Sequence, residues 1–146
     1  MTKNIFITSI IYFLLIVNVF SAGSDGDGGG ESKVKSNYEM AVSHIKFAKK
    51  LEKKGKLDKA KKRFEKAQKL LIKSNNKKPN NADTLNYLGF TTRKLGDFEN
   101  GEKYYLQGLA INPNHKGINE YLGELYVVTK RHNLAIERLE VLKGCN

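Results

Sequence analysis

The sequence is poor in residues that build disulfide or metal-linked frameworks. It contains one cysteine, Cys145, so no disulfide can form within the chain. Its three histidines, His44, His115 and His132, lie far apart, and no metal-ligand spacing surrounds them. We therefore predict no metal site and no cofactor. With 146 residues, the chain is long enough for one modest domain with a hydrophobic core.

Residue patterns that carry catalysis are also missing from the sequence. No nucleophile lies at a known spacing from a base, and no carboxylates are paired in a pocket context. The Gly-rich segment 23–37 lacks the preceding strand and the following Lys-Ser or Lys-Thr of a phosphate-binding loop. Glu120 and Glu124 lie one helical turn apart, which is more typical of a solvated or partner-facing edge than of a catalytic pair. We predict that the protein is not an enzyme.

Proline is almost absent from the part of the chain that has helical periodicity. Residues 37–146 contain only Pro79 and Pro113, which are 34 positions apart, and asparagine follows each of them. Proline cannot continue a helix, and asparagine is a good cap for the next one. The two prolines therefore mark the boundaries of helical units.

The first 36 residues differ in composition from the rest of the chain. Lys3 precedes an apolar run over residues 5–20, and short side chains at Val19 and Ser21 fit a cleavage after Ser21. As a helix this run is about 24 Å long, which is short for a hydrocarbon core of about 30 Å. We predict a secretory signal peptide over residues 1–21, with an uncleaved membrane anchor as the alternative. Residues 22–36 are predicted to be a flexible Gly-rich linker, and we expect an exported protein of the bacterial periplasm.

The rest of the chain contains a repeat with a period of 34 residues. Tyr-Leu-Gly at residues 87–89 recurs at residues 121–123. Leucines at helical spacing lie around the first copy at Leu85, Leu88 and Leu95, and Gly96-Asp97 then interrupts the pattern. A second helix carries its own stripe of Phe98, Gly101, Tyr105, Gly108 and Leu109. Such a helical hairpin cannot bury its apolar face alone, so it needs neighbouring hairpins.

These features resemble the tetratricopeptide repeat, a helix-turn-helix unit of 34 residues. In residues 82–115 the matching positions are Leu88-Gly89, the turn Gly96-Asp97-Phe98, Tyr105 and Pro113. Gly101 and Gly108 stand where the family prefers alanine. Since glycine costs about 1 kcal/mol of helix propensity, these positions predict either unusually close packing or a softer repeat.

The resemblance implies an all-α solenoid of about three antiparallel helix pairs, wound as a right-handed superhelix. The domain would span residues 37–146, with repeats at about 41–81, 82–115 and 116–146. Because Ala60 and Gly101 are 41 residues apart, we predict that the second helix of the first repeat is prolonged by about two turns. Ser36 and Glu39 predict a capping box at the start of the first helix.

The resemblance also implies that a peptide or partner protein binds in a concave groove lined by the first helix of each repeat. The groove positions fall on Lys49, Asn86, Phe90, Arg93, Lys94, Glu120 and Glu124. Phe90 and Glu124 stand where a groove that clamps a chaperone's terminal carboxylate would carry asparagine, which argues against that role. The other interpretation is that these are ordinary solvated helix residues.

Nearly all the excess positive charge lies in the first repeat. Between Ala41 and Lys78, fifteen Lys or Arg residues face three acids, whereas from Ala82 to Asn146 the count is eight against eight. The basic residues lie mostly opposite the apolar stripe of their helix, at Lys59, Lys62, Arg63, Lys66 and Lys69. Three interpretations are open: a solvated lysine-rich surface, attraction to anionic lipid or polysaccharide, or nucleic acid. Scarce arginine and the lack of interleaved aromatics argue against nucleic acid.

We therefore predict a non-catalytic protein-interaction module or scaffold of the cell envelope, which binds a partner protein or peptide in the groove. The alternative is a peripheral module that binds anionic lipid or polysaccharide through the first repeat. The uncapped third repeat further predicts self-association through Leu139 and Leu142.

Overall fold

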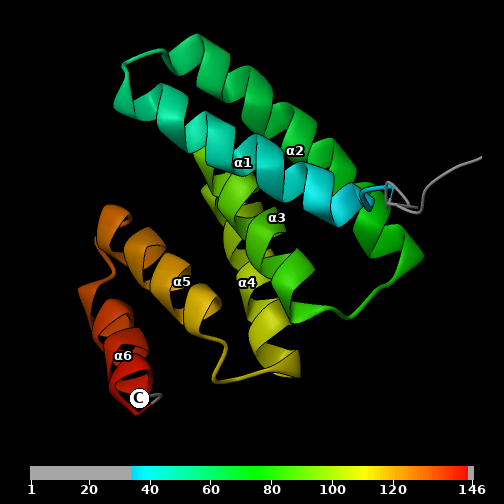
Figure 1. The fold of residues 1–146 in the computed structure, drawn as a ribbon. Coiled ribbons are helices and arrows are strands. Elements are labelled where there is room, and N and C mark those ends of the chain that lie inside the picture. Colours follow the sequence, from blue (N-terminus) through cyan, green and yellow to red (C-terminus); the bar gives the residue numbers. More distant parts are fainter. Residues whose placement is uncertain (1–33, 145–146) are drawn as a thin grey trace, which may run out of the picture. The chain divides into compact units, whose positions relative to one another are not determined.

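A computed structural model describes residues 34–144 of the chain, which form six α-helices in three antiparallel pairs (Figure 1). The pairs are α1 (Asn37–Lys53) with α2 (Leu57–Lys77), α3 (Ala82–Lys94) with α4 (Phe98–Ile111), and α5 (Lys116–Val128) with α6 (His132–Lys143). No strand occurs among the described residues, and the predicted all-α hairpin architecture is confirmed. The predicted signal peptide at 1–21, linker residues 22–33 and Cys145 lie outside the described residues.

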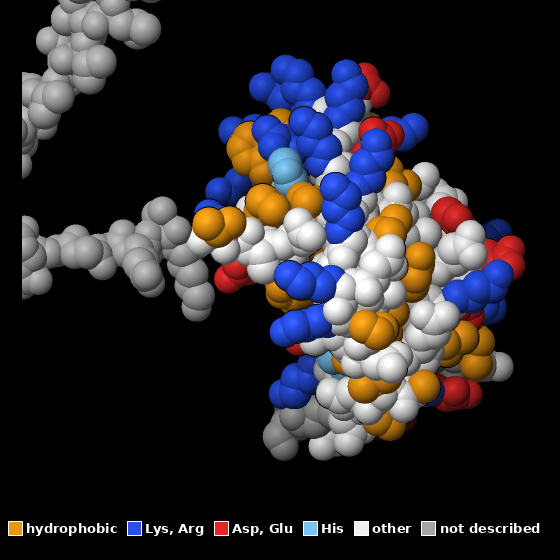
Figure 2. Space-filling model, turned by 90° about the vertical axis from the view of Figure 1, so that its right-hand side faces the viewer, with side chains coloured by type: hydrophobic (Ala, Val, Ile, Leu, Met, Phe, Trp, Pro, Cys, Tyr) orange, Lys and Arg blue, Asp and Glu red, His pale blue; other side chains and the backbone are white. Residues whose placement is uncertain are grey.

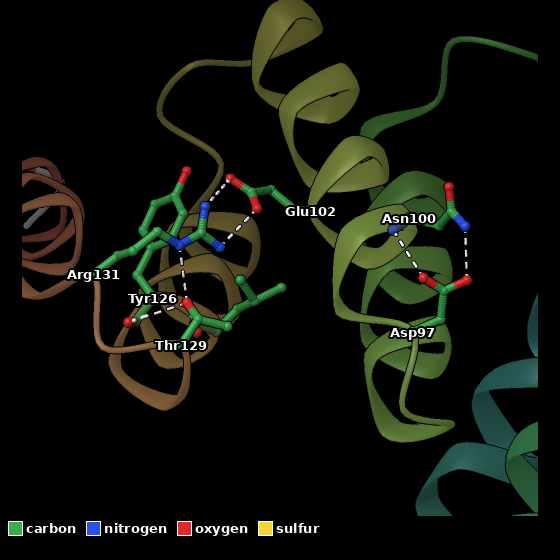
Figure 3. Close-up of polar contacts among 7 residues, drawn as sticks. Asp97, Asn100, Glu102, Tyr126, Thr129 and Arg131 are labelled. Atoms are coloured by element: carbon green, nitrogen blue, oxygen red, sulfur yellow. Dashed lines mark hydrogen bonds and ion pairs between the residues drawn. The ribbon is translucent and has the colours of Figure 1, made fainter.

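Four of the six described helices, α1, α3, α4 and α5, begin at a residue whose side chain accepts a free backbone N–H group. Ser36 and Glu39 form the predicted capping box, in which the Ser36 hydroxyl accepts from the Glu39 N–H at 3.2 Å and the Glu39 carboxylate accepts from the Ser36 N–H at 2.8 Å. Asp97 accepts from the Asn100 N–H at 3.1 Å (Figure 3). At the start of α5, His115 Nδ1 accepts from the Ile118 N–H at 3.1 Å. Local sequence therefore sets these helix starts.

The turns within the three hairpins share one backbone conformation. Gly55 and Gly96 have φ values of 67° and 97°, in the left-handed region. The third hairpin has Lys130 at the corresponding place with φ of 61°, so the turn is kept without its glycine. A side chain in this conformation costs about 1–2 kcal/mol.

The glycines of α4 lie at close helix contacts. A Cβ atom at Gly101 would lie 3.2 Å from the backbone oxygen of Gly89, and one at Gly108 would overlap the side chain of Ile118. The interpretation of unusually close packing at these two positions is confirmed. The prolonged second helix of the first repeat is confirmed as well, because α2 runs for 21 residues.

The hydrophobic core has two parts along the stack of hairpins. The first part surrounds Phe64 and Leu71 between α1, α2 and α3, and the second surrounds Tyr105 and Leu122 between α4 and α5. Burial raises the pKa of the Tyr105 phenol. Both parts consist of side chains from α1 to α5, so the described hairpins carry their own core. In contrast, α6 has no fully buried residue.

Candidate functional site

The first helices of the three hairpins, α1, α3 and α5, form one curved layer. Neighbouring packed helices have axes about 8–10 Å apart, so α1 and α5 would be about 16–20 Å apart in a flat layer. Lys49 on α1 nevertheless donates a hydrogen bond to the Tyr121 hydroxyl on α5 at 2.9 Å. The two side chains meet above α3, so the layer curves toward this side. We call it the inner face.

At the centre of the inner face, Phe90 is covered by side chains from both neighbouring helices. The Lys49 ammonium lies 4.7 Å from the Phe90 ring centroid, and the Tyr121 ring lies 4.8 Å from it. Below, Phe90 meets Phe64 of the core edge-on at 5.8 Å. Phe90 is only 4% exposed, so it lies beneath the surface of the inner face and is not itself accessible to a partner.

Two ion pairs near the C-terminal end of α3 join it to the other helices of the inner face. Arg93 Nη2 lies 2.7 Å from Glu124 Oε2 and joins α3 to α5. Lys94 Nζ lies 2.6 Å from Glu52 Oε1 and joins α3 to α1. The Arg93 side chain is almost buried whereas Glu124 is half exposed, so the Glu124 carboxylate is the part of this pair that solvent or a partner can reach.

The two other predicted groove residues lie apart from this cluster. Asn86 is buried between α3 and the start of α5, where its amide packs against Gly117. Glu120 is exposed and lines a different groove, on the far side of α5 toward α6. The structure therefore brings together Lys49, Phe90, Arg93 and Glu124, and places Lys94 beside them.

Sequence reasoning did not include the tyrosines of the inner face among the candidate site residues. The Tyr38 and Tyr87 rings lie 5.9 Å apart, and burial followed by the nearby Asp83 carboxylate raises the pKa of Tyr38 to about 12. Burial and the neighbouring Tyr121 raise the pKa of Tyr87. All three tyrosines are partly exposed. The sequence could have indicated two of them, because Tyr87 and Tyr121 are the tyrosines that recur at the 34-residue spacing.

A second surface is the outer side of the third hairpin, which we call the third-hairpin groove. Its volume is about 470 Å³ and its accessible lining is almost wholly apolar. The apolar lining residues are Val127, Ala135, Ile136, Leu139 and Leu142. Ile136 and Leu139 are 55% and 50% exposed, so helix α6 presents its aliphatic side chains to solvent.

The predicted basic residues gather on the first hairpin. Lys59, Lys62, Lys66 and Lys69 are exposed, and Arg63 is half-buried. Figure 2 shows Lys and Arg side chains crowding the top of the molecule, with exposed hydrophobic side chains among them. Burial, then the charges of Arg63 and Lys66, lower the pKa of His44 on this surface.

One arginine adds a network of polar contacts between the third hairpin and the second, beside the core packing of α4 against α5. Figure 3 shows Arg131, at the turn before α6, reaching Glu102 on α4. Both carboxylate oxygens accept from the guanidinium, at 2.9 and 2.7 Å, and Arg131 Nε donates to Thr129 Oγ1 at 3.0 Å. The guanidinium also lies 4.6 Å from the Tyr126 ring centroid. Neither this group nor any other described cluster has three His, Cys, Asp or Glu side chains placed to hold a metal ion.

Stacked helical hairpins with a curved inner face define a helical-repeat protein whose surfaces are suited to binding other molecules. The family described as Tetratricopeptide repeat matches residues 82–115, the second hairpin with its flanking turns. Residues 82–115 therefore contain a tetratricopeptide repeat, and a helical hairpin of similar architecture lies on each side of it. Repeats of this family generally mediate protein–protein interaction and generally act as non-enzymatic scaffolds.

Similar proteins agree with this assignment. A curated relative, the TPR repeat-containing protein of Borreliella burgdorferi, is 29% identical over 126 residues, which cover 86% of this chain and 50% of the relative. The solved structure of the MamA RS-1 ArsTM double mutant matches with a TM-score of 0.53 and 20% identity, over 73% of this chain and 56% of that one. This chain therefore spans about half the length of either protein. The structural likeness supports the fold alone.

Proposed function

We propose that this protein is a non-catalytic interaction module or scaffold of the cell envelope, which holds a partner protein or peptide on the inner face. The observation that carries the proposal is the cluster of Lys49, Phe90 and Tyr121, in which helices from all three hairpins contribute to one surface. Aromatic residues such as Tyr121 are enriched at the centres of protein interfaces.

The geometry supports an extended segment that crosses the three inner helices. Partly exposed Tyr87 and Tyr121 offer ring faces for apolar side chains of the partner. Lys49 and the Glu124 carboxylate offer one charge of each sign. Phe90 and Arg93 support these residues from below, so binding does not require either to be exposed.

The envelope location depends on the predicted export signal at residues 1–21. None of the described helices is long and apolar enough to cross a membrane. If the signal is cleaved, the protein purified from its host will begin at Ala22, and mass spectrometry of its N-terminal peptide will show this. A protein that retains residues 1–21 in the membrane fraction would instead support the anchored alternative.

A pull-down from envelope extract tests the role of the inner face. The bait is residues 22–146, which contain all of the described core. We compare the wild type with the double variant Lys49→Glu/Tyr121→Ser. The matched control is Lys103→Glu/Leu106→Ser, which changes two exposed residues on α4. Circular dichroism and thermal unfolding must first show that all three baits are folded.

We expect the wild type and the control to retain the same specific proteins at high salt. The inner-face variant should not retain them. Packed apolar contacts resist salt, whereas exposed charge pairs are screened over a Debye length of about 8 Å at physiological ionic strength and less above it. Equal recovery by the inner-face variant would show that partners use another surface.

A further inference from the structure

The first hairpin carries basic side chains that have no acidic partner within the described protein. In the other hairpins basic residues pair with acids, as in Lys103–Glu99, Arg131–Glu102 and Lys143–Glu140. Within residues 34–144, no lysine of α2 forms an ion pair. Glu52, one of the four acids of the first hairpin, pairs instead with Lys94 on α3. The positive charge of the first hairpin is therefore directed to solvent.

Six of the eight basic residues of α2 lie together on one face of the helix. Residues three and four positions apart lie on the same side of a helix, and these six follow this spacing. They are Lys59, Lys62, Arg63, Lys66, Lys69 and Lys73. The buried stripe of α2 faces the core from the other side, with Ala60, Phe64, Ala67 and Leu71. We call the basic side of α2, together with Phe47 of α1, the cationic face.

An exposed aromatic ring belongs to the same surface. Phe47 is 48% exposed, and the Arg63 guanidinium lies 4.7 Å from its ring centroid. Arg63 Nη1 also lies 3.1 Å from His44 Nδ1, so these contacts hold α1 and α2 together at this face. Exposed Lys46 and Lys50 flank Phe47 along α1. Phe47 therefore adds an exposed apolar ring to a surface that is otherwise basic.

We propose that the cationic face docks on a bilayer that contains anionic lipid, with its lysines at the headgroups and Phe47 in the interfacial region. Lysines near an anionic membrane each favour binding, and an aromatic side chain adds apolar contact at the boundary of the acyl chains. Five lysines with one arginine fit a diffuse layer of headgroups better than a fixed phosphate, for which the arginine fork is preferred. The protein would then sit on the membrane by its first hairpin and leave the inner face open to a partner.

Sedimentation with lipid vesicles tests this proposal. The protein is residues 22–146, because the apolar run at residues 5–20 would bind vesicles by itself, and the described hairpins have their own core. Vesicles of phosphatidylcholine are compared with vesicles of phosphatidylcholine and phosphatidylglycerol. The variant is Lys59→Glu/Lys62→Glu/Lys66→Glu. Its control, Lys103→Glu/Lys116→Glu/Lys143→Glu, changes the net charge by the same amount on other helices.

We expect binding to the anionic vesicles only, weakened at least tenfold by the reversals on the cationic face and less than threefold by the control. Phe47→Ala should weaken vesicle binding severalfold but leave binding to soluble polyglutamate unchanged. Equal losses for the two triple variants would assign binding to net charge and overturn the proposal. A second result would also overturn the proposal. In it, soluble polyglutamate or an anionic polysaccharide binds as tightly as the vesicles, and Phe47→Ala changes neither the binding of the vesicles nor that of the polyanion. The partner would then be a soluble polyanion.

Discussion

At the scale of single residues, two glycines of the same repeated motif have different neighbours. A Cβ atom at Gly89 would lie 2.5 Å from the ring of Tyr105, which is fully buried. A Cβ atom at Gly123, 34 residues later, would have the Cβ of Arg138 at 3.5 Å as its nearest neighbour, an ordinary contact. The same substitution to alanine should therefore have opposite effects at the two positions.

We predict that Gly89→Ala lowers the free energy of unfolding by about 1–3 kcal/mol, because overpacking exceeds the gain in helix propensity. Gly123→Ala should raise it by about 0.5–1 kcal/mol, since only the propensity gain applies there. Urea unfolding followed by circular dichroism measures both values. A stabilised Gly89→Ala variant would show that the α3–α4 contact can open, contrary to the packing described above.

The inner face shows which residue properties the sequence could reveal. The family's groove positions led to Lys49, Phe90, Arg93 and Glu124, and the structure places these four around one point. Their exposure was not predictable. Phe90 is buried because Lys49 and Tyr121, which are 72 residues apart, close over it. Contacts across three repeats depend on the curvature of the layer, which no local pattern records.

At the scale of helices and turns, the sequence was most informative where a boundary depends on neighbouring residues. The capping box at Ser36 and the prolonged α2 could be predicted because both follow from local spacing. In the third turn, Lys130-Arg131 stands at the position that Gly96-Asp97 occupies in the second hairpin. The structure shows that Lys130 adopts the left-handed conformation and that Arg131 forms an ion pair with Glu102. No local pattern predicts this ion pair, because Glu102 is 29 residues away.

Arg131 should therefore anchor the third hairpin to the second. We predict that Arg131→Lys lowers the free energy of unfolding by roughly 1 kcal/mol, because an ammonium group cannot bond both oxygens of Glu102 and also Thr129. Hydrogen exchange should show faster exchange in α6, whose helix has no fully buried residue, and little change in α2. Arg138→Lys is the control, because Arg138 makes only long single-atom contacts among the described residues, to Glu137 at 3.5 Å and to Asn119 at 3.4 Å. Equal losses of stability in both variants would indicate that the bidentate ion pair between Arg131 and Glu102 has no special role.

At the scale of the whole molecule, the two ends of the stack differ in chemistry. The first hairpin carries the cationic face, and the third carries an apolar groove beside a helix that buries no residue completely. The division of charge was visible in the sequence because it follows position along the chain. The sequence predicted only that Leu139 and Leu142 could join a second copy. The groove itself was not predictable, because its shape depends on the packing of α6 on α5.

We predict that the third-hairpin groove pairs with the same groove of a second copy. The cationic face of another copy would place lysines against apolar side chains, which disfavours a head-to-tail arrangement and favours a closed two-fold dimer. Leu139→Glu should weaken dimerisation at least tenfold, since each dimer would bury two uncompensated carboxylates. Leu106→Glu is the control, because Leu106 is 47% exposed on α4 and Leu139 is 50% exposed on α6. Sedimentation velocity of residues 22–146 over a range of concentrations measures the association. A wild-type protein that stays monomeric at high concentration, or equal weakening by both variants, would show that this groove does not join two copies.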